Sequence, residues 1–307
     1  MKKNLLRTCI GLAVGGSLLI TSTIMTMATG PSGYETLKAV IKNSNNMENA
    51  TFNISGSLKD NNEELIKIDS LIKMSEQDHL ASGKISITTD MIDKNYTFYK
   101  AEDKMILKDD DSNVYNQFTC NKEFKEKKFC KKDSQVKKCD NPQMSAIGET
   151  IIDTLVGDFK RHVTLTNIGN NEKQIGINLD KNEIPSLLNL ILSAKCQSKY
   201  QNECENKDKM FQILGIDPEN YQVPKLTSNI TVEKIGVQII VDQNDTIKEM
   251  DLELNVTGND AQNQFRNQNF KLTIVISDVN STIVDIIDLN GREVNEILLD
   301  EFSCNSY

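Results

Sequence analysis

The sequence predicts an α+β protein, in which a curved antiparallel sheet carries helices on its concave face. Short segments that alternate apolar and polar residues recur along most of the chain and are separated by polar turns. This pattern favours a meandering antiparallel sheet. A few longer segments instead repeat apolar residues at helical spacing, which is typical of helices packed on a sheet. Two half-domains divided near residue 160 are the alternative arrangement.

The N-terminal segment is predicted to be a transmembrane anchor. Lys2, Lys3 and Arg7 precede an uncharged run over residues 8–29. A bilayer core is crossed by a helix of about 20 such residues. The positive residues on its N-terminal side place residues 1–7 in the cytoplasm.

A cleaved signal peptide is the alternative for the same segment, because small residues Thr26 and Ala28 could precede a cleavage site. A lipoprotein signal is absent, because Cys9 precedes the apolar stretch instead of following it. Both readings place residues 31–307 outside the cytoplasm as one α+β domain. That domain stays at the cell membrane if the segment is uncleaved and is secreted if it is cleaved.

Composition limits the classes of partner and the kind of core. The chain has a formal net charge of -9, although its first 30 residues contain no acidic residue. Residues 31–307 are therefore acidic, which argues against a general nucleic-acid binder. Trp is absent and aromatic residues make up only 6% of the chain, so the predicted core is aliphatic.

A helix over about residues 33–45 is predicted directly after the anchor. Ser32 and Glu35 have the spacing of a capping box, which satisfies free backbone N–H groups at a helix start. The apolar residues that follow at helical spacing are Tyr34, Leu37, Val40 and Ile41. An uncleaved domain would therefore be held close to the membrane surface, with almost no linker.

The next segments are predicted strands, followed by a turn rich in aspartate. The strand signals lie at residues 51–55, 67–72, 84–88, 96–99 and 104–108. Asp109, Asp110 and Asp111 then predict a solvated turn between two strands. A calcium loop is the alternative, although the loop glycine and the bidentate Glu of such loops are missing.

A lysine-rich, cysteine-bearing insert spans residues 119–140. It could contact anionic headgroups or cell-wall polymers, because lysines near an anionic surface are attracted to it. A solvated loop tethered by disulfides is the alternative. The candidate contact residues are Lys122, Lys125, Lys127, Lys128, Lys131, Lys132, Lys137 and Lys138.

The second half of the chain combines predicted helices and longer strands. Helices are expected at residues 144–159 and 184–192, with a short terminal helix built on Val294, Ile297, Leu298 and Phe302. A hairpin turn is expected at residues 243–245. The strand signals lie at residues 163–165, 174–179, 230–232, 236–241, 247–256, 270–276 and 282–287.

Six cysteines follow the anchor, and an even number in an extracytoplasmic chain predicts disulfides. They are Cys120, Cys130, Cys139, Cys196, Cys204 and Cys304. A local bridge between Cys196 and Cys204 is the simplest pairing, but sequence does not choose among the possibilities. A zinc site is the alternative, without C-x-x-C spacing or a neighbouring His to favour it.

Catalytic and cofactor motifs are not found, so we expect a protein that is not an enzyme and needs no cofactor. His79 and His162 are the two histidines, and neither belongs to H-E-x-x-H. Neither G-x-S-x-G nor a phosphate-binding loop occurs. Both histidines are expected to be solvated or capping residues.

Two stretches resemble known families. Residues 30–35, Gly-Pro-Ser-Gly-Tyr-Glu, resemble the start of poorly characterised membrane-anchored proteins of spore-forming Firmicutes. Residues 237–287 resemble the closing strands of LolA/LppX-type lipoprotein carriers, through the turns at residues 241–247 and 277–280. The second resemblance implies an unclosed β-barrel with helices in its opening and a lipid-like ligand between them.

These expectations together favour a non-enzymatic protein of the cell envelope that binds a lipid-like or apolar ligand. Its expected partners are the membrane, through the single-pass anchor, and that ligand. The alternative is a structural or sensory envelope protein that acts through protein partners and has no small-molecule ligand.

Overall fold

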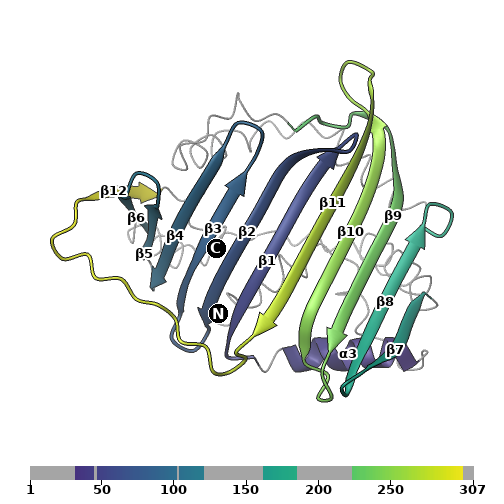
Figure 1. Cartoon of the computed structure of the whole chain (residues 1–307), viewed down its shortest axis with the longest axis horizontal. Coiled ribbons are helices and arrows are strands. Elements are labelled where there is room, and N and C mark those ends of the chain that lie inside the picture. Colours follow the sequence, from purple (N-terminus) through teal and green to yellow (C-terminus); the bar gives the residue numbers. More distant parts are fainter. Residues whose placement is uncertain (1–31, 45–46, 102–103, 121–161, 185–222, 300–307) are drawn as a thin grey trace, which may run out of the picture.

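The computed structural model describes residues 32–44, 47–101, 104–120, 162–184 and 223–299. Within these ranges the chain forms one large β-sheet and one helix (Figure 1). The following account concerns these residues alone.

The first half of the sheet is an antiparallel meander in which each strand pairs with the next one along the chain. Several turn residues, including Asn61, Asn62 and His79, have positive φ angles, a backbone region that asparagine tolerates better than most residues. All five strands predicted here are confirmed, and a sixth was not predicted. The strands are β1 (Asn49–Asp60), β2 (Glu63–Ser75), β3 (Leu80–Thr88), β4 (Asp93–Ala101), β5 (Lys104–Asp109) and β6 (Val114–Cys120).

The second half is another antiparallel meander. The predicted strands at 230–232 and 236–241 are one continuous strand here. The predicted turn at 243–245 is confirmed, because Asp242 Oδ1 accepts hydrogen bonds from the backbone N–H groups of Asn244 and Thr246. The strands are β7 (Val163–Gly169), β8 (Glu172–Asp180), β9 (Ser228–Val241), β10 (Ile247–Asn259) and β11 (Phe265–Ser277).

The two meanders are joined by antiparallel pairing of β1 with β11, from Thr51 opposite Ser277 to Asp60 opposite Gln268. A last strand, β12 (Val294–Leu299), adds in parallel to β6. The order across the sheet is therefore β12-β6-β5-β4-β3-β2-β1-β11-β10-β9-β8-β7. The edge strands β12 and β7 do not pair with each other, so the sheet is open and unclosed, as the fold prediction expected.

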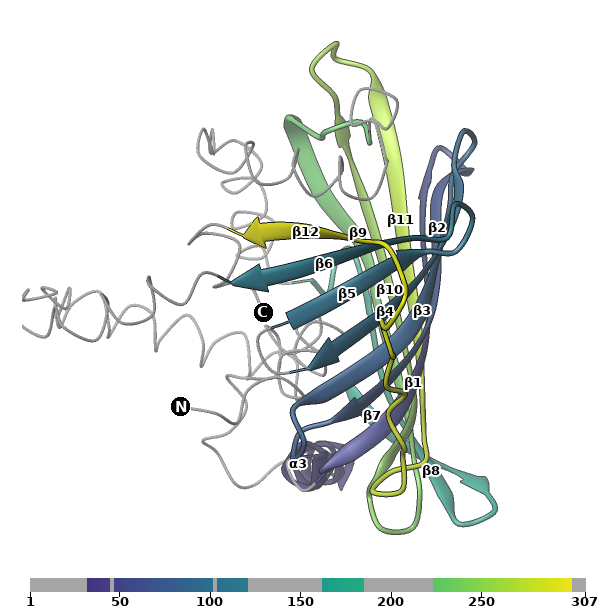
Figure 2. The ribbon, with the colours of Figure 1, turned by 90° about the vertical axis from the view of Figure 1, so that its left-hand side faces the viewer.

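The sheet has one apolar face and one polar face, because side chains alternate between the two faces of a strand. On β1 the residues Ala50 and Phe52 are buried, whereas Asn53 and Ser55 are exposed. We call the apolar face the inner face and the opposite one the outer face. The sheet curves so that β4, β5 and β6 turn toward the side on which the helix lies (Figure 2).

The helix α3 (Ser32–Ser44) confirms the helix predicted at 33–45. It packs on the inner face beside β7 and β8, and Tyr34, Leu37 and Val40 are its buried residues. Gly33 permits this close packing, because a Cβ atom there would lie 2.9 Å from the carbonyl oxygen of Val163. Within the described ranges, α3 is the one helix on this face.

Two predictions near the C-terminal end were wrong. Residues 282–287 were expected to form a strand, but Thr282–Leu289 do not pair with any strand through a ladder of backbone hydrogen bonds. The predicted helix beginning at Val294 is instead the strand β12, because the free edge of β6 offers backbone partners to it. We call residues 278–293, which connect β11 to β12, the crossing segment.

Other predictions fall outside the described residues. They include the anchor at residues 8–29, the helix at 144–159 and the helix at 184–192, of which only Ile184 is described. The expectation of several helices on the concave face is therefore not supported beyond α3. No helix in the described ranges is both long enough and apolar enough to span a bilayer.

Candidate functional site

The inner face carries an apolar surface that continues from strand to strand. The register across β1, β11 and β10 places apolar residues side by side in rows. One row is Ile54, Ile274 and Met250, and a second row, farther along the strands, is Leu58, Phe270 and Leu254. We call this the inner apolar surface.

Along the inner apolar surface, burial decreases from the row that contains Ile274 to the row that contains Phe270. Ile274 and Met250 are 2% and 3% exposed. Leu58 and Phe270 are only partly buried, and Ile68 on β2 is 36% exposed. The inner apolar surface therefore extends well beyond the strands β7 and β8 that α3 contacts.

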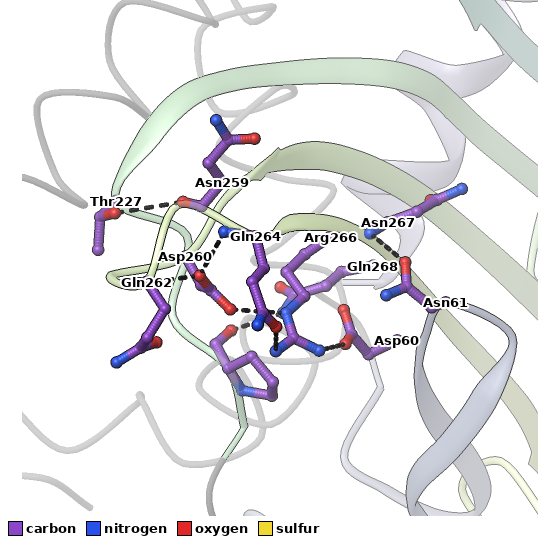
Figure 3. A network of polar contacts seen from close by, with 11 residues as sticks. Asp60, Asn61, Thr227, Asn259, Asp260, Gln262, Gln264, Arg266, Asn267 and Gln268 are labelled. Carbon is purple, nitrogen blue, oxygen red and sulfur yellow. Dashed lines mark hydrogen bonds and ion pairs between the residues drawn. The ribbon is translucent and has the colours of Figure 1, made fainter.

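A network of charged side chains ends this surface where β1 and β10 finish and β11 begins (Figure 3). Arg266 Nε donates a hydrogen bond to Asp260 Oδ2 at 2.8 Å, and Nη1 donates to Asp60 Oδ2 at 3.1 Å. Nη2 donates to Gln264 Oε1 at 3.1 Å. Asp60 and Asp260 are 4% and 5% exposed. We call these four residues the Arg266 network.

The Arg266 network and the inner apolar surface share one face of the sheet. Asp60 lies two residues after Leu58 on β1, and its register partner Gln268 lies two residues before Phe270 on β11. Residues two apart on a strand point to the same face. The charged network therefore directly follows the row that contains Leu58 and Phe270.

The turn between β10 and β11 positions Asp260. Its Oδ1 accepts hydrogen bonds from the backbone N–H groups of Gln262 and Gln264 at 3.0 and 2.9 Å. The hydrogen bond from the Gln264 N–H, with further donors including Arg266, holds the pKa of Asp260 below its ordinary value. Asp260 is therefore an ionised partner for Arg266 at neutral pH.

One oxygen of the network has no partner. Asp60 Oδ1 is buried, and no donor of the described residues lies within hydrogen-bond distance of it. Nearby polar groups are already engaged: Gln268 Nε2 donates to the Pro224 carbonyl at 2.6 Å, and Asn61 Oδ1 accepts from the Asn267 N–H. Buried acceptors in proteins are nearly always hydrogen-bonded. We therefore expect a donor from outside the described residues to bind this oxygen.

A second apolar cluster lies under the other end of the sheet and contains Tyr96, Leu107 and Phe118. Burial raises the pKa of Tyr96 to about 12, with a further contribution from the negative charges of Asp109 and Asp111. The Tyr96 phenol is therefore neutral across the physiological range. Its environment is that of a core residue.

The outer face is polar and solvated. Lys234 contacts Glu253 at 2.7 Å, and Lys67 contacts Asp69 at 2.7 Å. These contacts lower the pKa of both carboxyl groups. Ion pairs this exposed contribute little to stability, because water screens them. The pattern keeps this face in water.

An open hollow of about 400 Å³ lies on the outer face over β1 to β4. Its lining includes Asn53, Asp69, Leu71, Lys84 and Asn95. Asp69 is already paired with Lys67 and accepts a hydrogen bond from Ser55 at 2.7 Å. The hollow is open to solvent, and the apolar side chains of Leu71 and Val275 in its lining are each 37% exposed.

The crossing segment runs over the outer face and contacts successive strands through side chains. Thr282 and Thr51 share a hydrogen bond of 2.9 Å between their hydroxyl groups. Asp285 accepts from Lys73 Nζ at 3.1 Å, and Arg292 hydrogen-bonds the hydroxyl of Tyr115. Two isoleucines of this segment are very exposed: Ile283 at 82% and Ile286 at 80%.

The structure tests few of the predicted site residues. Cys120 is the last residue of β6, and the other five candidate cysteines lie outside the described residues. All eight candidate lysines of the insert, from Lys122 to Lys138, also lie outside them. The disulfide and surface-contact predictions therefore stay predictions.

The aspartate-rich segment forms the predicted turn, between β5 and β6. Asp109 Oδ1 accepts from the backbone N–H groups of Asp111 and Ser112 at 2.9 and 3.1 Å. Asp110 contacts Lys108 at 2.8 Å. No group of three or more Asp, Glu, His or Cys residues in the described ranges could hold a metal ion.

The two histidines lie apart from the Arg266 network. His79 is exposed in the turn between β2 and β3, with a φ of 56°. His162 precedes β7, and its Nδ1 lies 3.7 Å from Glu183 Oε1.

Sequence reasoning did not find the Arg266 network. Asp60 ends β1 and Arg266 lies at the start of β11, 206 positions farther along the chain, whereas Asp260 and Gln264 lie in the turn before β11. One signal was available, because Asp60 interrupts an alternation of apolar residues that includes Phe52, Ile54 and Leu58. A charged residue at an inward position predicts a buried partner.

Comparisons with known proteins give no family. No family model matches the chain, and no curated protein matches it. A solved structure titled "Lipid-protein interactions in lipovitellin" is similar at 8% identity and a TM-score of 0.25, covering 78% of this chain and 26% of that one. This chain thus spans about a quarter of its length. A dehydratase-cyclase domain from ambruticin biosynthesis is similar at 9% identity and a TM-score of 0.12, with 80% of each chain covered. At these TM-scores neither structure indicates what this chain does.

Proposed function

We propose that this chain is a non-enzymatic protein of the cell envelope that binds a lipid-like or apolar ligand on its inner apolar surface. The observation that carries the proposal is the extent of that surface beyond α3. Large side chains such as Leu58, Ile68 and Phe270 remain partly buried or exposed there. Contiguous exposed apolar surface on a soluble domain marks a binding site for apolar partners.

The shape of the sheet supports the same proposal. The sheet is unclosed and curves toward the inner face (Figure 2), so an elongated apolar molecule could lie along the strands. Apolar rows are spaced by two residues, or roughly 7 Å along a strand. The apolar rows from Ile274 to Phe270 therefore extend for about 14 Å on β11.

The location is part of the proposal. Lys2, Lys3 and Arg7 before the uncharged run at 8–29 support a single-pass anchor with the main domain outside the cytoplasm. A reporter enzyme fused after Tyr307 is expected to be active only outside the cytoplasm. Activity of the same fusion in the cytoplasm would contradict this topology.

The alternative is a structural or sensory envelope protein that acts through protein partners. The exposure of Ile283 and Ile286 on the crossing segment favours it, because both are apolar side chains held out in solvent. In that case a protein should cross-link reproducibly to the domain in cells. Replacing both isoleucines with serine should abolish the cross-link while leaving lipid binding unchanged.

The proposed ligand is tested directly on purified residues 31–307. We expect native mass spectrometry to show a co-purifying lipid and titration with a fluorescent fatty acid to show saturable binding. If the domain neither carries lipid nor takes up the fatty acid, the ligand-binding proposal is wrong.

Two neighbouring residues on β11 provide matched variants. Phe270 is partly buried on the inner face, whereas Lys271 lies on the outer face with its side chain 60% exposed. Phe270→Glu should weaken fatty-acid binding by about tenfold or more, because a charge would enter the apolar surface. Lys271→Glu should leave binding unchanged. Equal losses in both variants would place the ligand elsewhere.

A further inference from the structure

The Arg266 network contains one buried oxygen that needs a donor, and the identity of that donor follows from the charges around it. Asp60 and Asp260 carry two negative charges, and Arg266 supplies one positive charge (Figure 3). The site is therefore negative by one charge. A buried site with excess negative charge favours a positively charged partner.

An anionic headgroup does not fit the Arg266 network. Each of the three guanidinium nitrogens donates one of the five N–H groups within the network: Nε to Asp260, Nη1 to Asp60 and Nη2 to Gln264. A carboxylate or phosphate would also lie beside two buried carboxylates and be repelled by them. Arg266 thus serves to hold the aspartates and does not receive an acid.

A bare metal ion also fits poorly. Hard cations require several oxygen ligands around one point, and the described residues contain no cluster of three or more metal-binding side chains. Asp60 Oδ1 offers a single free acceptor. A group that donates one hydrogen bond and carries a positive charge suits this geometry better.

The surroundings indicate what that positive group is attached to. Asp60 directly follows the row of Leu58, Phe270 and Leu254 on the inner apolar surface. A ligand that lies along this surface would present its end to Asp60. The ligand must therefore be apolar along its length and positive at that end.

We propose that Asp60 Oδ1 binds the protonated primary amine of an amphiphile whose apolar part lies on the inner apolar surface. This inference rests on the proposed ligand-binding function and adds the chemistry of the headgroup. The amine could belong to a free alkylamine or to an aminolipid headgroup, since both present the same ammonium group. Arg266 acts as a positioning residue that orients Asp60, and Asp260 in turn orients Arg266.

The first test uses the unmodified full chain in an amphipathic polymer and three probes of equal chain length: octylamine, octanol and octanoate. Octylamine is expected to bind at least about tenfold more tightly than octanol and octanoate, since a charge-assisted hydrogen bond contributes this much. Equal affinity for all three would overturn the headgroup assignment while leaving the proposed apolar site intact. Binding of none of them would count against the proposed function itself.

The second test uses two matched substitutions. Asp60→Asn keeps the shape of the side chain and removes its charge, so octylamine binding should weaken by about tenfold while octanoate binding does not weaken. Asp69→Asn on the outer face should change neither. If Asp60→Asn leaves octylamine binding unchanged, a bound water satisfies Oδ1 and the inference is wrong. If Asp60→Asn does not fold, the comparison of octylamine, octanol and octanoate on the unmodified chain still tests whether the site binds an amine.

The source of the amine is distinguished by a third probe, dihexanoyl phosphatidylethanolamine. Binding as tight as that of octylamine would identify an aminolipid headgroup. Much weaker binding, with octylamine still bound, would identify a free alkylamine, because the lipid phosphate is repelled by the two aspartates. Either result supports the assignment of Asp60 as the amine-binding residue.

Discussion

The ring of Phe98 lies directly against the backbone of Gly83, its register partner on the neighbouring strand. A Cβ atom at position 83 would be 2.7 Å from Phe98 Cε1 and 2.4 Å from the carbonyl oxygen of Leu71. Both distances are shorter than real Cβ contacts. Only glycine fits here, so this contact fixes how β2, β3 and β4 pack.

Substituting Gly83→Ala is therefore expected to destabilise the fold by about 1–3 kcal/mol, the usual cost of overpacking. Gly56→Ala is the matched control on the same face, because its Cβ would be 3.6 Å from Leu272 Cδ1, an ordinary contact. Urea unfolding followed by circular dichroism measures both. A similar loss in the two variants would contradict the role given to Phe98.

The docking of α3 depends on Leu37, which is 1% exposed. Leu37→Ala should cost about 2–5 kcal/mol, because it removes buried methyl groups and leaves a cavity. Lys42→Ala, on an exposed position of the same helix, should change stability by less than about 0.5 kcal/mol. Comparable unfolding midpoints for the two variants would show that α3 contributes little to the fold.

Acid is expected to weaken the end of the sheet that holds the Arg266 network. The pKa of Asp260 is lower in the folded chain than its ordinary value of 3.8. Its stabilising contribution is therefore present above that ordinary value and is lost as the pH falls through the folded value. The free energy of unfolding should be measured from about pH 6 to about pH 3. It should decrease less steeply with falling pH in Asp260→Asn than in the unmodified chain. Parallel curves would contradict this role.

Alkaline pH is expected to lower the stability of the fold through Tyr96, because burial raises the pKa of its phenol from 10.0 to about 12. Between these values the unfolded chain loses the phenol proton and the folded chain keeps it, so stability falls as the pH rises through this window. Ultraviolet titration of tyrosinate should show one phenol in the unmodified chain that ionises near pH 12 and is missing from Tyr96→Phe. If the two titrations coincide, Tyr96 is accessible to water.

The cysteine prediction is tested by counting thiols. Denatured protein purified from an oxidising compartment should show fewer free thiols without reductant than with it, because Cys120 and the five cysteines after it are expected to pair. Peptide mapping would then give the pairing. Equal thiol counts in the two conditions would exclude disulfides.

Much of the sheet could be predicted from sequence because its strands alternate regularly. Segments such as Lys84–Thr88 and Gln174–Leu179 place apolar residues at every second position, and polar turns separate them. α3 was equally clear from the spacing of its apolar residues. These features are local, so they do not depend on which strand becomes the neighbour.

The missed elements all depend on distant parts of the chain. On β6, Tyr115 is buried on the outer face, where Arg292 contacts it, and Phe118 is buried on the inner face. The two buried residues are three positions apart, so the strand does not show an alternating pattern. Thr282–Ile287 have strand-like composition but cross the strands, where no backbone ladder can form. The Arg266 network likewise exists only once β1 and β11 are neighbours.

Pairing of β1 with β11 also sets an order of folding. Within each meander, strands that follow one another in the sequence pair. Pairing of β1 with β11 instead joins residues far apart in the sequence, such as Thr51 and Ser277, and such distant contacts form slowly. During synthesis β1 therefore keeps an unpaired edge until β11 has been made. Unpaired strand edges attract other chains, so the edge of β1 is open to aggregation with other chains until β11 has been synthesised.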